Sequence, residues 1–188
     1  MTRRPVSTRG PDREVAISRE EYRDLMSGFP TGVAVVTGLD VDGNPCGMTC
    51  SSLTSVTLDP PTLLVCLRLG SRTATAVRDR GAFAINLLHA GAQRTAQLFA
   101  APLGDRFSEV SWELSPAGLP WLPDDATALA ECAVARTVVA GDHSVVFGRV
   151  ERTVQLSHNP LLFGMRRFQP WEPPAVKPAT SRHREENR

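Results

Sequence analysis

The fold is decided by residues 43–61, which read GNPCGMTCSSLTSVTLDPP. The stretch begins with turn-forming residues and ends at a double proline, two signals that interrupt regular structure. Between them, apolar and hydroxyl side chains alternate with the two-residue period of a β-strand. The apolar positions are Cys46, Met48, Cys50, Val56 and Leu58, and the hydroxyl positions are Thr49, Ser51, Ser55 and Thr57. Leu53 and Thr54 break the alternation, which predicts a bend near Ser52.

A row of small hydroxyl groups on one face of a strand has two interpretations. It is typical of an ordinary strand that faces solvent. It also leaves room beside the backbone, where a planar ligand with polar edges would find hydrogen-bond donors and acceptors. The stretch by itself leaves both interpretations open.

The size and charge of the chain limit the classes of partner. A length of 188 residues predicts one domain with tails. The formal net charge of +1 gives no electrostatic reason to expect nucleic acid or a membrane surface as a partner. No apolar run of about 18 residues occurs, and the N-terminal residues lack the apolar core of a signal peptide. We therefore expect a cytoplasmic protein without a nucleic-acid or membrane partner.

The four cysteines fit a cytoplasmic location. Cys46 and Cys50 lie four residues apart on the expected strand, which separates their α carbons by about 13 Å, too far for a disulfide or a shared metal. Cys66 and Cys132 lie in apolar runs and are interpreted as small core residues. No histidine pairs with a cysteine at ligand spacing, so we expect no metal site.

The rest of the pattern predicts many strands and few helices. Residues 18–21 form a capping box, Ser-Arg-Glu-Glu, which starts a helix that ends near Gly28. Residues 29–32 are expected to form a turn. Further helices are expected at 74–80 and 92–99, and strands at 33–37, 62–69, 82–88, 128–139 and 144–156. The pattern favours a mainly β fold, a closed or nearly closed antiparallel barrel at residues 17–170, with disordered tails at 1–16 and 171–188.

Three polar residues are candidates for function. Ser71 precedes the helix at 74–80, so it either simply caps that helix or forms part of an anion site at the helix N-terminus. Asn86 lies inside an apolar strand and needs backbone or ligand partners. His143 follows Gly-Asp in a tight turn, which exposes its ring.

Several common motifs are missing. The chain has no glycine-rich dinucleotide or P-loop signature, and neither a His-Glu-x-x-His nor a Gly-x-Ser-x-Gly motif. The usual sequence support for a hydrolase or a kinase is therefore lacking.

Seven short motifs together resemble the short-chain flavin reductases. In order they are Phe29-Pro30-Thr31-Gly32-Val33, Gly47-Met48-Thr49-Cys50-Ser51-Ser52, Asp59-Pro60-Pro61, Asn86-Leu87-Leu88, Asp105-Arg106-Phe107, Gly141-Asp142-His143 and Pro160-Leu161-Leu162. The resemblance covers residues 17–168. It implies an antiparallel Greek-key split β-barrel of the FMN-binding type and a homodimer. It also implies an enzyme that uses NADH or NADPH to reduce FMN or FAD and supplies the reduced flavin to a flavin-dependent monooxygenase.

The resemblance also implies roles for single residues. Thr31, Gly32 and Val33 would belong to the flavin cradle, and Met48, Thr49, Cys50, Ser51 and Ser52 would meet the isoalloxazine edge and the ribityl chain. Ser71 and Thr73 would hold the phosphate, while Phe83 and Asn86 would lie near the flavin. Arg106 would approach the flavin tail or pair with a carboxylate. His143 would position the nicotinamide nucleotide.

One position departs from the family pattern. Phe163 stands where members of the family often have tyrosine, so the ring can pack on a ligand but donates no hydrogen bond. Hydride transfer between a nicotinamide and a flavin needs no side-chain acid or base, and no catalytic dyad is expected. Two alternatives stay open: a flavin-binding electron carrier and a split-barrel oxidase that lacks NAD(P)H turnover.

Overall fold

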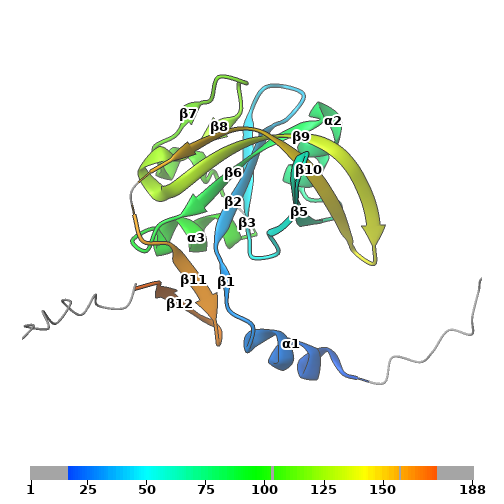
Figure 1. Cartoon of the computed structure of the whole chain (residues 1–188), viewed down its shortest axis with the longest axis vertical. Helices are drawn as coiled ribbons and strands as arrows, with labels where there is room; N and C mark the ends of the chain where they lie inside the picture. Colours follow the sequence, from blue (N-terminus) through cyan, green and yellow to red (C-terminus); the bar gives the residue numbers. More distant parts are fainter. Residues whose placement is uncertain (1–16, 103, 157, 173–188) are drawn as a thin grey trace, which may run out of the picture.

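The computed structural model describes residues 17–102, 104–156 and 158–172 (Figure 1). Its main feature is a seven-stranded antiparallel sheet with the order β3-β2-β6-β9-β10-β5-β4. The strands are β2 Ala34–Leu39, β3 Pro45–Cys50, β4 Thr54–Leu58, β5 Pro61–Arg68, β6 Ala82–Leu88, β9 Ala126–Ala140 and β10 His143–Gln155. The expected mainly β, antiparallel fold is confirmed.

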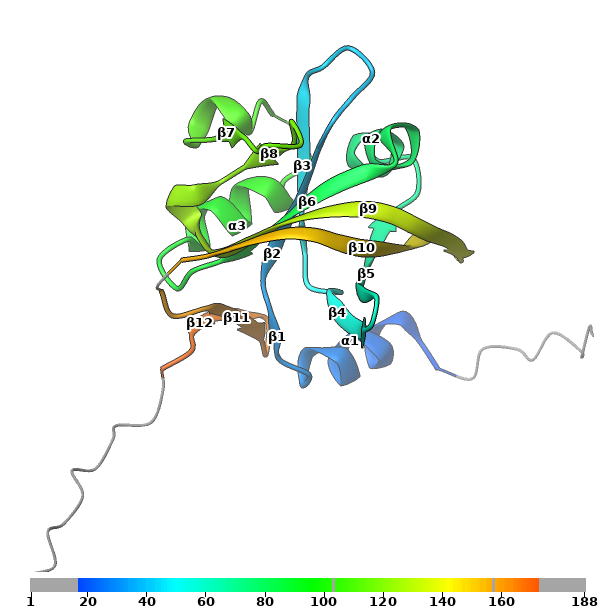
Figure 2. The ribbon, with the colours of Figure 1, turned by 45° about the horizontal axis from the view of Figure 1, so that its top comes forward.

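The sheet curls until β3, at one end, approaches β5 near the other end (Figure 2). The side chain of Ser52 joins the two there: its Oγ accepts from the Cys66 N–H at 3.0 Å and donates to the Cys66 carbonyl at 3.3 Å. A side chain therefore closes the sheet where no β-ladder does, which fits the expected split barrel. The predicted bend at Ser52 is the interruption between β3 and β4.

Three helices and two small sheets complete the described chain. The helices are α1 Arg19–Ser27, α2 Arg72–Arg80 and α3 Gln93–Ala100, and short 3₁₀ turns span Phe107–Glu109 and Pro123–Asp125. The small sheets join β1 Thr31–Gly32, β11 Leu161–Gly164 and β12 Arg167–Pro170, and β7 Glu113–Leu114 with β8 Pro120–Trp121. The capping box of α1 is confirmed: Ser18 Oγ accepts from the Glu21 N–H at 3.1 Å, and the Glu21 carboxylate accepts from the Ser18 N–H at 2.7 Å.

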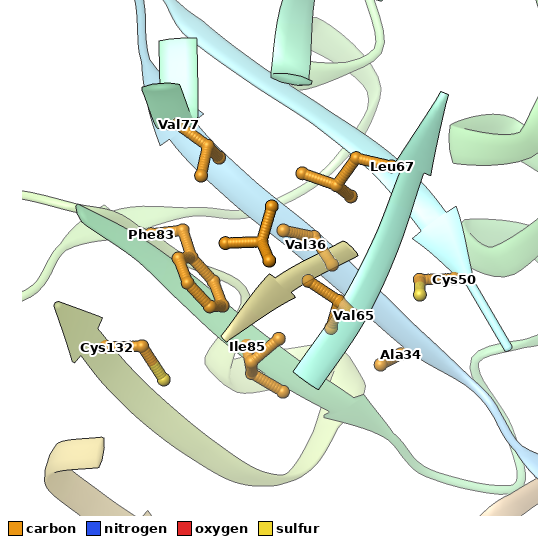
Figure 3. Packing of buried hydrophobic residues seen from close by; sticks show 10 residues of the cluster. Ala34, Val36, Cys50, Val65, Leu67, Val77, Phe83, Ile85 and Cys132 are labelled. Carbon is orange, nitrogen blue, oxygen red and sulfur yellow. The ribbon is translucent and has the colours of Figure 1, made fainter. Parts of the chain in front are cut away.

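The barrel interior is filled by aliphatic side chains around Phe83 (Figure 3). Val36, Val65 and Phe83 have no exposed surface. Strand β10 passes so close to the ring that a Cβ at Gly148 would lie 2.4 Å from Phe83 Cζ, so only glycine fits there. Close packing of this kind fixes the strands that carry the candidate site.

Two expectations differ from the structure. Thr31 and Gly32 form the short strand β1, because Thr31 pairs with Phe163 and Gly32 with Leu162, whereas a turn was expected. The apolar face predicted for residues 43–61 is buried only along β3. On β4 every residue is exposed, and Val56 and Leu58 have 45% and 89% of their surface accessible, because β4 is the edge strand of the sheet.

Some predictions fall outside the described residues. The expected tail at 1–16 lies wholly outside them, and so does all but the start of the expected tail at 171–188. None of the described helices has the length and apolar character needed to cross a bilayer.

Candidate functional site

Two hollows flank strand β3 and the bend that follows it. The α2 hollow has a volume of about 910 Å³ and lies between β3, the start of α2 and the segment after α3. The α1 hollow has a volume of about 960 Å³ and lies between α1, residues 51–54 and the β11–β12 turn. Nine of the predicted site residues line one hollow or the other. The α2 hollow is lined by Met48, Thr49, Ser71, Thr73 and Arg106, and the α1 hollow by Thr31, Ser51, Ser52 and Phe163.

The start of α2 forms one wall of the α2 hollow. Ser71 Oγ accepts from the Ala74 N–H at 3.1 Å and lies 3.9 Å from Met48 Sδ, so the side chain is a helix cap. The first N–H groups of a helix have no intrahelical acceptor, and this cap leaves those of Arg72 and Thr73 for another partner. The Thr73 side chain itself is buried. An anion in this hollow would therefore meet backbone N–H groups and the positive end of the helix dipole.

Arg106 closes the opposite side of the α2 hollow. Its guanidinium donates to the Gly47 carbonyl at 2.7 Å and also to the Ala101 carbonyl. No carboxylate of the described residues pairs with it, contrary to one of the two expectations for it. Its Nε is buried without a hydrogen-bond partner among the described residues. Arg106 thus holds the segment after α3 against β3 and leaves positive charge on the wall. Gly47 is required here, since a Cβ would lie 2.9 Å from the Phe99 ring.

The hydroxyl of Thr49 is already engaged within the protein. Thr49 Oγ1 donates to the Ala96 carbonyl at 2.6 Å and thereby attaches α3 to β3. At the rim, Arg72 pairs with Asp40 at 2.6 Å. The hydrogen bond from Arg72, followed by that from the Asn44 N–H, lowers the pKa of Asp40. The carboxylate therefore stays ionised and neutralises Arg72.

The α1 hollow has aromatic and hydroxyl walls. The Phe163 ring lies 5.0 Å from the Phe168 ring, so its orientation is fixed by packing. Thr31 Oγ1 is buried without a partner among the described residues, which is uncommon for a buried hydroxyl and suits a ligand atom. Ser51 is exposed at the bend. The Ser52 hydroxyl is engaged with the Cys66 backbone, and we call this contact, where the curled sheet closes, the seam.

Four predicted flavin contacts have side chains buried in the core. Phe83 and Asn86 have no exposed surface, and Val33 and Cys50 are 3% and 4% exposed. Asn86 donates to the Val35 carbonyl at 3.0 Å and to Thr37 Oγ1 at 3.2 Å, and its Oδ1 accepts from the Leu122 N–H at 2.8 Å. Both side chains are therefore engaged within the protein: Phe83 fills the barrel, and Asn86 joins its own strand to the segments at Val35–Thr37 and Leu122.

Cys50 serves the seam. Its Sγ lies 3.0 Å from Ser52 Oγ, and burial raises the pKa of the thiol. All four cysteines are free, and the described residues hold no cluster of three or more His, Cys, Asp or Glu side chains arranged to bind a metal. Gly32 is exposed in β1 and lines neither hollow.

His143 begins strand β10. It does not line the α2 hollow but lies next to its wall. It is opposite Arg68 in the ladder, and Arg68 is part of the hollow wall. His143 Nδ1 lies 2.7 Å from Asp142 Oδ1. The hydrogen bond from His143 lowers the pKa of Asp142, so the carboxylate is ionised and accepts, and Nδ1 carries the hydrogen. This leaves Nε2 of a half-exposed ring free to face a ligand.

Sequence reasoning did not identify several residues of the α1 hollow. Arg166 lines it from the β11–β12 turn, and α1 contributes Glu20 and Ser27 together with Arg19, Tyr22, Arg23 and Met26. The spacing of Arg19, Tyr22, Arg23 and Met26 is the one signal that could have indicated a shared face, since residues three, four and seven apart lie on one side of a helix.

The chain was compared with known proteins. A model of the flavin reductase like domain matches residues 26–172. A flavin reductase (NADPH) of Lentzea aerocolonigenes is 54% identical over 158 residues, which cover 84% of this chain and 92% of that protein. The solved structure of Streptomyces globisporus NADH:FAD oxidoreductase SgcE6 in complex with NAD and FAD fragments has a TM-score of 0.78 and 34% identity, over 84% of this chain and 94% of that one.

A second solved structure extends the likeness to a reductase that is named for an oxygenase system. The styrene monooxygenase flavin reductase of Pseudomonas putida has a TM-score of 0.74 and 32% identity, over 81% of this chain and 99% of that one. The family model alone covers well over half of the chain. Together with the split-barrel architecture and the paired hollows beside β3, these likenesses show that the chain belongs to the flavin reductase family.

Proposed function

We propose that this chain is an NAD(P)H:flavin oxidoreductase, which transfers a hydride from NADH or NADPH to FMN or FAD. The observation that carries the proposal is the position of β3 and its bend between two unlike hollows. One hollow has the N-terminus of a helix and a cationic wall, and the other has aromatic and hydroxyl walls. A flavin has the matching parts, an anionic tail and a planar ring system with polar edges.

The available polar atoms fit a flavin placed along β3. The N–H groups at the start of α2 and the cationic Arg106 suit the phosphate, and the unpartnered Thr31 hydroxyl and the exposed Ser51 suit the ring edge. Met48 would lie between the two. Phe163 and His143 would then orient the nicotinamide nucleotide.

The side chains have a limited task in this reaction. The bound flavin supplies the redox chemistry, and the protein supplies binding, orientation and exclusion of water. No acid or base is required, which is consistent with walls made of hydroxyls, backbone amides and arginines. The predicted site roles above remain part of the proposal.

The proposal extends to assembly and partners. We infer a homodimer because apolar side chains are exposed on α1 and on the edge strand β4, with Leu25 69% and Leu58 89% exposed. We also infer a cytoplasmic enzyme that hands reduced flavin to a flavin-dependent monooxygenase. Residues 17–170 are proposed to be sufficient for activity, so removal of residues 1–14 and 174–188 should leave flavin turnover intact.

A flavin carrier and a flavin reductase differ in stoichiometry. A carrier should purify yellow and oxidise no more than one equivalent of NADH or NADPH per bound flavin. A reductase that treats flavin as a substrate should oxidise many equivalents when free FMN or FAD is added. The test is to titrate NADH and NADPH into protein that has been freed of flavin, with and without added flavin in air.

A further inference from the structure

The walls of the α1 hollow carry more positive than negative charge, because three arginines, Arg19, Arg23 and Arg166, and one carboxylate, Glu20, line it. Arg19 and Arg23 lie four residues apart on the face of α1 that lines the hollow. Like charges at this spacing repel, and Arg19 is also the first residue of the helix, where the dipole disfavours a cation. Among the described residues, ion pairs engage Arg166 but neither Arg19 nor Arg23. A bound anion would relieve both unfavourable interactions.

The structure holds this helix face over the hollow. The Met165 N–H donates to the Ser27 carbonyl at 2.6 Å, and the Arg166 guanidinium contacts the Asp24 carboxylate. Met165 and Arg166 both have a left-handed backbone, with φ of 49° and 59°, a conformation that residues other than glycine rarely adopt. The β11–β12 turn thus accepts strain while it fixes α1 and adds Arg166 to the wall.

The other walls suit a nucleotide. Tyr22, Phe29 and Phe163 offer aromatic surfaces on which a base can stack, and Tyr22 and Phe29 are 54% and 64% exposed. Arginines recognise phosphate by paired N–H donors. Aromatic rings and arginines in one hollow therefore point to the adenosine half of a dinucleotide.

The length of α1 indicates which phosphate Arg19 would meet. Under the proposed function, on which this inference rests, the flavin ring edge lies beside Thr31 and Ser51, and hydride transfer requires the nicotinamide to lie against that ring. The C-terminal end of α1 is joined to β1, whereas Arg19 begins the helix, about 12 Å from Ser27 at 1.5 Å per residue. Arg19 and Arg23 are thus displaced toward the adenosine end. The 2′-phosphate of NADPH lies there, and NADH lacks it.

We infer that Arg19 and Arg23 bind the 2′-phosphate of NADPH and give this enzyme a preference for NADPH over NADH. The test combines kinetics with direct binding. In the Arg19→Gln, Arg23→Gln double variant, KM for NADPH should rise about tenfold or more at a fixed flavin concentration, because charge-assisted hydrogen bonds are lost. KM for NADH should change by less than about twofold, since NADH has no group for these arginines.

Calorimetry supplies a readout that needs no turnover. Wild-type protein should bind adenosine 2′,5′-bisphosphate about tenfold more tightly than 5′-AMP, and the double variant should lose this difference. Arg78→Gln is the matched control, because Arg78 is an exposed arginine of α2 that lines neither hollow. Higher salt should also reduce the difference in affinity of the wild type for the two adenosine phosphates, since exposed charges are screened.

Three outcomes would overturn the inference. Equal rises in KM for both nucleotides would mean that the arginines bind a part that NADH and NADPH share. Unchanged kinetics and binding in the double variant would remove the arginines from the site, and an equal effect of Arg78→Gln would make the effect non-specific. If the wild type oxidises neither nucleotide but still discriminates between the two adenosine phosphates, the proposed function fails and the phosphate site stands.

Discussion

Ser52 Oγ lies 3.0 Å from the backbone nitrogen of Cys66 and also donates to the carbonyl of the same residue. One hydroxyl thus satisfies both backbone groups of a residue on β5, at the place where β3 and β5 approach without forming a ladder. The next residue toward β3, Ser51, is exposed and lines the α1 hollow. Two adjacent serines therefore differ: Ser52 is engaged in the fold, and Ser51 faces the candidate site.

Ser52→Ala and Ser51→Ala should separate stability from flavin binding. Ser52→Ala leaves the Cys66 backbone groups without their partner and should lower the free energy of unfolding by about 1–3 kcal/mol, measured by urea denaturation. Ser51→Ala should leave that free energy within about 0.5 kcal/mol and weaken flavin binding instead. Equal stability losses in the two variants would contradict the assignment of the seam to Ser52.

His143→Ala should impair the use of NADH and NADPH more than the binding of flavin. Asp142 contacts Nδ1 and leaves Nε2 available, so under the proposed function the substitution would remove one hydrogen bond to the nucleotide. We expect kcat/KM for the nucleotide to fall by a few-fold to about a hundredfold, with flavin Kd unchanged. Unchanged nucleotide kinetics would make His143 an ordinary solvated residue, and a parallel loss of flavin affinity would place it in the flavin site.

Asp142→Asn is the control for the orientation of that ring. Asparagine keeps the size of the side chain but removes the charge that draws Nδ1–H. The variant should show a smaller defect than His143→Ala in the same direction. A larger defect in Asp142→Asn would mean that the carboxylate itself is the important group.

Glu131 should make the stability of the fold depend on pH. Its side chain is 7% exposed, and its oxygens accept from the Ala117 N–H at 2.7 Å and from Arg152 at 3.1 Å. Burial by itself would raise the pKa of Glu131, but hydrogen bonds from Ser115 and Ala117, together with the charge of Arg152, lower it below the usual value. Because the folded-state pKa is depressed, the stabilisation is present above the unfolded pKa and is lost as the pH falls through the folded pKa.

The matching experiment compares Glu131→Gln with the wild type across pH. At neutral pH the variant should unfold with a free energy about 1–3 kcal/mol smaller, because a buried network loses its charge. The difference in the free energy of unfolding between variant and wild type should shrink as the pH falls below the usual pKa of glutamate. A constant difference down to pH 3, far into the acid range, would be the opposite of this prediction.

The edge strand β4 should mediate dimer formation. Leu58→Lys places a charge in the most exposed apolar position of β4 and should convert a dimer at micromolar concentration into a monomer, as measured by light scattering. Val41→Lys is the control, because Val41 is 83% exposed in the β2–β3 turn, at the opposite end of the barrel in Figure 2. A wild-type monomer, or a dimer that tolerates Leu58→Lys, would argue against this interface.

Local sequence signals predicted the parts of the fold that depend on neighbouring residues. The capping box at Ser18, the N-cap at Ser71 and the bend at Ser52 all formed as expected. The alternation in residues 43–61 failed along β4, because a two-residue period cannot tell whether the apolar face of an edge strand is covered within one chain. Leu58 is exposed for that reason.

The candidate site was harder to predict because its contacts are distant in the sequence. A polar residue inside an apolar strand, such as Asn86, suggests a ligand contact. Its hydrogen-bond partners are instead Val35, Thr37 and Leu122, which only the folded sheet brings together. Arg106 likewise reaches back to Gly47. The resemblance to a family indicated residues that line the two hollows beside β3, while the burial and hydrogen bonds of each side chain were needed to recognise those that are engaged within the fold.

The most direct test of flavin reductase activity is the steady-state oxidation of NADH and NADPH, followed by absorbance, with catalytic protein and added FMN or FAD. A flavin reductase should give many turnovers in at least one of the four combinations and none when flavin is omitted from flavin-free protein. No oxidation beyond one equivalent in any combination would contradict the claim that this chain is a flavin reductase.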